Sequence, residues 1–185
     1  MPRVLLALAA FLLAVLVPTA SGGTADLITA DQRLVDALTL LDANPHTNGL
    51  REVLDSNQVH IQFVPMANGI YARYSVARHV VEIDDKWANA DTRTLAAVIA
   101  HEATHAQDAV SGNLSAGGSD ACIDSEIRAF RTAALFWIDR FGPKGKADAE
   151  DDLERQLNLI ADRQLHDADG LGDLVRQTYT AQCSH

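Results

Sequence analysis

Two histidines and a glutamate interrupt an apolar stretch near the middle of the chain. The segment LAAVIAHEATHAQDAV, residues 95–110, places His101, Glu102 and His105 in a run with helical periodicity. Residues four apart on an α-helix share a face, so both imidazoles can reach one metal ion. Glu102 projects about 100° away from His101, too far to be a ligand but close enough to contact a water molecule on that ion. Zinc-dependent hydrolysis uses this arrangement.

An alternative explanation is a pair of core histidines satisfied by ordinary hydrogen bonds. The stripe that leads to them, Thr94, Ala97 and Val98, is mostly apolar, so we expect both rings to point inward. A catalytic zinc site keeps three protein ligands and one open position. The sequence must therefore supply a third ligand downstream of the two histidines.

We expect Glu126 to be that third ligand. A carboxylate on an apolar helix face is costly to bury without a cationic partner, and a zinc ion would be such a partner. A salt bridge to Arg73 or Arg78 is the alternative. Asp120 and Asp124 are weaker ligand candidates, because acids near a helix start also act as caps. The face of Glu126 also carries Cys122, Ile123, Ala129, Phe130, Ala133 and Trp137.

HEATH, followed by Glu126 in EIRAF, resembles the gluzincin group of zinc metallopeptidases, especially its compact minimal members. The resemblance covers roughly residues 59–141. It implies that His101, His105 and Glu126 bind Zn²⁺ and that Glu102 is the general base. It also implies that the strand HVVEID, residues 79–84, is an edge that aligns an extended peptide substrate.

The chain departs from the pattern of many such relatives at one position. They place an aspartate four residues after the ligand glutamate to orient a histidine, whereas this chain has Phe130 there. The residues that orient the ligands must therefore come from elsewhere. For the donor to the developing oxyanion we favour His166, with Tyr71, Tyr74 and His79 as rivals.

The pattern of the remaining chain predicts an α+β, zincin-like fold. Three short segments with alternating apolar residues, VHIQFVP, GIYARYSV and HVVEID, predict a small antiparallel sheet. Helical periodicity predicts an active-site helix and a mainly helical C-terminal part. The expected helices span about 29–43, 50–54, 93–111, 120–141, 147–166 and 171–181.

The N-terminus has the features of a secretory signal peptide. Arg3 is followed by a 14-residue apolar run and then by small residues, which predicts cleavage between residues 20 and 25. An uncleaved anchor is the alternative, but the run is shorter than the roughly 20 residues that a bilayer crossing needs. We take residues 1–22 as the signal peptide and 23–185 as one domain. The protein is then secreted or held in the cell envelope, with no membrane attachment after cleavage.

Charge and cysteine content restrict the partners. The formal net charge is -10, and removal of residues 1–22 takes away one arginine and no acid, which leaves -11. Such a surface repels phosphate backbones, so we exclude nucleic acid as a partner. In an oxidising compartment Cys122 and Cys183 most simply form one disulfide bond. Two buried free thiols or a thiolate metal ligand are the alternatives.

Together these features predict a secreted zinc metallopeptidase that acts on a peptide or protein substrate. A relative that keeps the metal without turnover and acts as a binding module is one alternative. A metallohydrolase with a non-peptide substrate is another.

Overall fold

The computed structural model describes residues 28–114 and 118–184, so the predicted signal peptide lies outside the described residues. The α+β class is confirmed. In chain order the elements are α1 (Gln32–Asp42), α2 (Leu50–Ser56), β1 (His60–Val64), β2 (Ala72–Ser75), β3 (Val80–Asp84), the 3-10 helix η1 (Asp85–Trp87), α3 (Thr92–Val110), α4 (Ser119–Phe141), α5 (Asp152–His166) and α6 (Ala168–Tyr179). Within the described ranges no helix is both long and apolar enough to cross a membrane.

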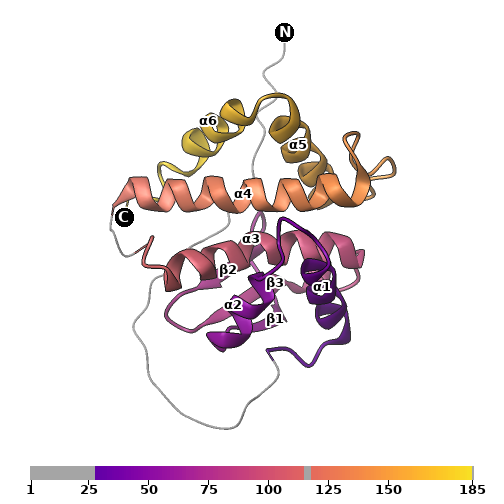
Figure 1. Ribbon diagram of the computed structural model, residues 1–185, viewed down its shortest axis with the longest axis vertical. Helices are drawn as coiled ribbons and strands as arrows, with labels where there is room; N and C mark the ends of the chain where they lie inside the picture. Colours follow the sequence, from indigo (N-terminus) through magenta and orange to yellow (C-terminus); the bar gives the residue numbers. More distant parts are fainter. Residues whose placement is uncertain (1–27, 115–117, 185) are drawn as a thin grey trace.

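The two longest helices, α3 and α4, lie side by side in the middle of the molecule (Figure 1). The sheet, α1 and α2 pack on the side of α3, whereas α5 and α6 pack on the opposite side of α4 (Figure 1). The side chains of all these layers contribute to one hydrophobic cluster. This layering places the helix with the two histidines at the centre of the molecule.

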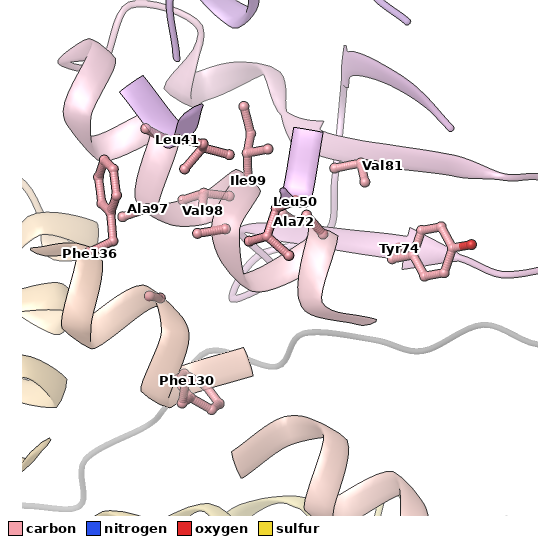
Figure 2. Packing of buried hydrophobic residues seen from close by; sticks show 14 of the residues in the cluster. Leu41, Leu50, Ala72, Tyr74, Val81, Ala97, Val98, Ile99, Phe130 and Phe136 are labelled. Atoms are coloured by element: carbon pink, nitrogen blue, oxygen red, sulfur yellow. The ribbon is translucent and has the colours of Figure 1, made fainter. Parts of the chain in front are cut away.

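Helix α3 is buried around its whole circumference. Its start is fixed by Asp91, whose carboxylate accepts a hydrogen bond from the backbone N–H of Arg93 at 2.8 Å. Every residue from Thr94 to Ala106 is buried, because α3 lies between the sheet layer and α4. Figure 2 shows Val98 and Ile99 of α3 among apolar side chains from other elements. The predicted inward stripe is thus part of a helix that is inward on all sides, and Glu102 is buried with the histidines.

The sheet is mixed, so the prediction of an antiparallel sheet was wrong. The strand order is β1-β3-β2, in which β1 pairs with β3 in parallel and β2 pairs with β3 antiparallel. All five residues of β3 are buried. The prediction that HVVEID forms a substrate-aligning edge was also wrong, because β3 is hydrogen-bonded on both sides. Alternating polarity reports which face of a strand is buried but does not report which neighbour it pairs with.

The disulfide bond between Cys122 and Cys183 is confirmed, with a Cα–Cα distance of 5.6 Å. It joins the first turns of α4 to the segment that follows α6. Neither cysteine is free, which excludes the alternatives of buried thiols and a thiolate ligand. A bond of this kind indicates an oxidising compartment.

Candidate metal centre

Three potential ligands converge between α3 and α4. His101 and His105 come from successive turns of α3, and Glu126 comes from the second turn of α4. The two histidine Nε2 atoms are 3.1 Å apart. Each of them lies 3.5 Å from a different oxygen of the Glu126 carboxylate. The two helices therefore bring together the three residues that the sequence pattern predicted as ligands.

The spacing of the three groups fits a tetrahedral metal ion. Zinc binds imidazole nitrogen and carboxylate oxygen at about 2.0–2.1 Å, which separates neighbouring tetrahedral ligands by about 3.3 Å. The two histidine nitrogens are 3.1 Å apart and each lies 3.5 Å from one of the two oxygens of Glu126, all close to this value, and one ligand atom from each of the three residues lies within 4.8 Å of the others. The donors can therefore hold one small divalent cation without rearrangement of the helices.

The centre is almost closed to solvent. The exposed fractions of His101, His105 and Glu126 are 1%, 3% and 2%. The predicted alternative, a salt bridge from Glu126 to Arg73 or Arg78, is not formed. Both arginines instead pair with Glu82 in the sheet, at 2.6 and 2.8 Å.

The protonation states in the centre suit a cation. Although burial acts to raise it, the two histidines lower the pKa of Glu126 to about 2. Burial lowers the pKa of His101 to about 4, against the effect of Glu126. Burial also acts to lower the pKa of His105, but Glu126, Glu102 and Asp108 raise it overall. The carboxylate of Glu126 and the neutral imidazole of His101 are thus in the protonation states that metal binding requires. On binding, a cation would replace the proton that gives His105 its positive charge.

Glu102 lies beside the centre with no ordinary structural partner. It is fully buried, and within the described residues neither of its carboxylate oxygens has a hydrogen bond of normal geometry. Burial raises its pKa to about 8; the charge of His105 and the backbone of Tyr74 oppose this, and Glu126 adds to it. A buried carboxylate without a strong partner is costly, so it indicates a role in binding or chemistry.

The support for His105 comes from two residues that the sequence analysis missed. Ser125 lies 2.8 Å from Nδ1 of His105 and donates a hydrogen bond to Asp108 at 2.7 Å. Phe130 packs its ring against His101 in a T-shaped arrangement, with ring centroids 4.6 Å apart. Asp108 could have been found from its spacing, because it follows His105 by three residues and so continues the inward face of α3.

A small cavity of about 20 Å³ adjoins His101. This volume has room for roughly one water molecule. The cavity is bounded by α3, α4 and α5, with Tyr71 ahead of β2. Its lining residues are Tyr71, Ala97, Val98, His101, Phe130, Ala133, Leu153, Gln156, Leu157 and Ile160.

Several predicted site residues lie elsewhere. His166, favoured as the oxyanion donor, ends α5 with 69% of its side chain exposed and lies 3.7 Å from Asp162. It is not among the residues that line the cavity, because it lies at the exposed C-terminal end of α5. His79 is exposed and contacts the Asn57 carbonyl. Asp124, a weaker ligand candidate, pairs with Arg176 at the surface.

Comparison with known proteins adds no family assignment. No protein-family model matches the chain, and no curated protein or solved structure matches it at a significant level. The site must therefore be interpreted from its own geometry and chemistry.

Proposed function

We propose that this protein is a zinc-dependent hydrolase that cleaves peptide bonds. The observation that carries the proposal is the convergence of His101, His105 and Glu126 at metal-binding distances. Beside them is the carboxylate of Glu102, which makes no hydrogen bond of normal geometry with the described residues. Two imidazoles and one carboxylate suit zinc among the common divalent ions. When bound, the ion would supply Lewis acidity, which polarises a carbonyl and lowers the pKa of a water molecule towards 7.

Glu102 has the properties required of the general base. Its neighbours within the described residues do not satisfy its oxygens. Burial raises its pKa to about 8, and the charge of a bound cation would lower that pKa, so that the ionised carboxylate could accept a proton from a water molecule in the centre. It is on the helix that carries both histidines, and this helix is fixed by packing on all sides. The position of the carboxylate is therefore set before any substrate arrives.

Tyr71 is the candidate that best fits the role of oxyanion donor. Among the rivals of His166, it alone lines the cavity that contains His101. Tyr74 is 1% exposed within the core, and burial raises its pKa. A phenol beside the reacting carbonyl can donate a hydrogen bond to the charge that develops there.

Strand β2 takes over the role first expected of β3. It is an edge of the described sheet, and it packs against α3. The backbone of Tyr74 in β2 is near enough to Glu102 to affect its pKa. An extended peptide that added to this edge would pass close to the proposed base.

A second candidate function is that of a binding module in which the metal stabilises the fold. The closed state of the centre favours it, because a cavity of about 20 Å³ does not admit a peptide unless α5 moves. In that case Glu102 would be buried without taking part in turnover.

The two candidates differ in what Glu102→Gln does. For a hydrolase, we expect stoichiometric zinc in the wild type and in the variant, with peptide cleavage reduced at least about 1000-fold by loss of the base. Glu82→Gln is the control, since it changes a buried glutamate in the sheet. Equal cleavage by wild type and Glu102→Gln would refute the catalytic role. Stoichiometric zinc without cleavage of any peptide in a broad library would favour the binding module.

A further inference from the structure

A continuous chain of hydrogen bonds connects the candidate ligand His105 to a buried carboxylate. Nδ1 of His105 lies 2.8 Å from Oγ of Ser125, and this oxygen lies 2.7 Å from Oδ2 of Asp108. Ser125 is 1% exposed and Asp108 is 3% exposed. The chain crosses from α3 to α4 and returns to α3.

The direction of each hydrogen bond follows from the chemistry of its ends. An ionised carboxylate can only accept, so the single hydroxyl proton of Ser125 goes to Asp108. The oxygen of Ser125 must then accept from His105, and Nδ1 of His105 must carry the proton. The lone pair of the neutral ring is therefore on Nε2, the atom that faces His101 and Glu126.

Asp108 is itself firmly held. The guanidinium of Arg128 donates to it through Nε and Nη2 at 2.9–3.1 Å, and the side-chain amide of Asn113 donates at 3.2 Å. These donors offset the cost of burying the carboxylate and keep it an acceptor. The chain is thus anchored at the end distant from the metal centre.

We propose that Ser125 is a positioning residue, which through Asp108 fixes the tautomer and the ring orientation of His105 for metal binding. The inference rests on the metal site of the proposed function. It does not require that the protein cleave peptides. Because Ser125 directly precedes Glu126, the same hydroxyl also fixes the relative positions of the two ligand-bearing helices.

Four variants test the proposal. Ser125→Ala removes the hydroxyl relay between Asp108 and His105, and Ser125→Thr keeps a hydroxyl. Asp108→Asn replaces the acceptor by a group that can also donate and therefore no longer fixes the direction of the chain. The matched control is Thr104→Ala, which removes a buried hydroxyl of α3 that donates to the carbonyl of Ala100 at 2.8 Å.

Zinc affinity, measured by competition with a chelator, is the first readout. We expect Ser125→Ala to bind zinc about 10–100-fold more weakly and Asp108→Asn to bind it about 10-fold more weakly. Ser125→Thr and Thr104→Ala should stay within about 3-fold of wild type. Thermal unfolding of each metal-free variant shows whether that variant folds. If Ser125→Ala does not fold, the zinc affinity of Asp108→Asn still tests the proposal.

The second readout is the Nδ1 proton of His105 in ring ¹H–¹⁵N spectra, with and without zinc. It should be protected from exchange with water in wild type, Ser125→Thr and Thr104→Ala, and lose that protection in Ser125→Ala. Unchanged protection, or unchanged zinc affinity, in Ser125→Ala would overturn the proposal, as would a Ser125→Thr variant as weak as Ser125→Ala. If the relay results are as expected but no variant cleaves peptides, the proposed function fails and the relay stands.

Discussion

The two sides of His101 are built in different ways. Towards α4 the ring faces Glu126 and His105, a buried group of polar side chains at 3.1–3.5 Å. Towards α5 it faces a cavity whose other walls are mostly apolar, including Leu153 and Leu157. We call α3 with α4 the floor, and α5 with α6 the cover.

This difference indicates separate tasks for the two regions. In the floor, the burial of polar groups has a free-energy cost that a bound cation would offset. A change in the geometry of the floor would therefore weaken cation binding. The cover contributes mainly apolar packing, which tolerates substitution as long as volume is retained. We therefore expect the floor to determine metal binding and the cover to determine stability and access.

The largest expected effect comes from removal of a ligand in the floor. Glu126→Ala should weaken zinc binding at least about 1000-fold, because two imidazoles on one helix cannot complete a tetrahedral site. Elemental analysis of the purified protein, with Glu82→Ala as control, measures the effect. Stoichiometric zinc in Glu126→Ala would show that the metal binds elsewhere. It would also contradict the expectation that the floor determines metal binding.

The disulfide bond ties the segment after α6 to the first turn of α4, and its loss should lower stability without changing metal binding. The bond closes a loop with a sequence separation of 61 residues, for which the chain-entropy model gives about 4 kcal/mol of stabilisation. The double variant Cys122→Ala/Cys183→Ala should lose about this much free energy of unfolding in urea titrations. Zinc affinity should change less than about 3-fold. A loss of zinc affinity beyond that would mean that the floor depends on the cover.

Leu157→Ala opens the cavity from the side of the cover. Leu157 is 4% exposed, and its truncation should lower the free energy of unfolding by about 2–4 kcal/mol. Zinc affinity should not change, whereas peptide cleavage should become several-fold faster if α5 restricts access. Leu171→Ala in α6 removes the same atoms from a buried site that does not line the cavity, so it should not change cleavage. Equal rates for both variants would show that α5 is not the barrier.

The smallest expected effect concerns the polar contact that joins the two regions. Glu154 of α5 accepts hydrogen bonds from Thr94 of α3 and from Lys146. Although burial opposes it, these bonds lower the pKa of Glu154. Because the pKa of Glu154 is lower in the folded chain than its ordinary value of 4.5, ionised Glu154 stabilises the fold above that pH. This contribution is lost as the pH falls through the folded pKa.

Glu154→Gln should therefore be less stable than wild type at pH 7 by about 1–2 kcal/mol. The difference should shrink as the pH falls below about 4. Urea titrations at the two pH values measure it. Asp152→Asn changes an acid on the same helix whose side chain is 79% exposed, so it should show no such dependence. A pH-independent difference for Glu154→Gln would remove the electrostatic explanation.

The sequence predicted the helices and the convergence of His101, His105 and Glu126 well, because both depend largely on local spacing. The i,i+4 spacing of His101 and His105 fixes their common face regardless of the rest of the fold. Glu126 was predicted because a carboxylate on an apolar helix face requires a cation. These inferences needed no knowledge of which elements are neighbours.

The features that the sequence did not predict depend on contacts between distant segments. The position of β3 between β1 and β2 depends on pairing, which alternation of polarity does not encode. The role of Ser125 depends on the register of α4 against α3. The exposed position of His166, outside the cavity lining, was not foreseen, because proximity of the chain ends through the disulfide bond does not fix the direction of a side chain on α5.

The strand order also constrains the path by which the protein folds. Strands β1 and β2 follow each other in the chain but are not neighbours, because β3 lies between them. The hairpin of β2 and β3, joined by only residues 76–79, involves local contacts and should nucleate early. Strand β1 can then add to the free side of β3 only by closing a longer loop, so its docking should be the slower kinetic step.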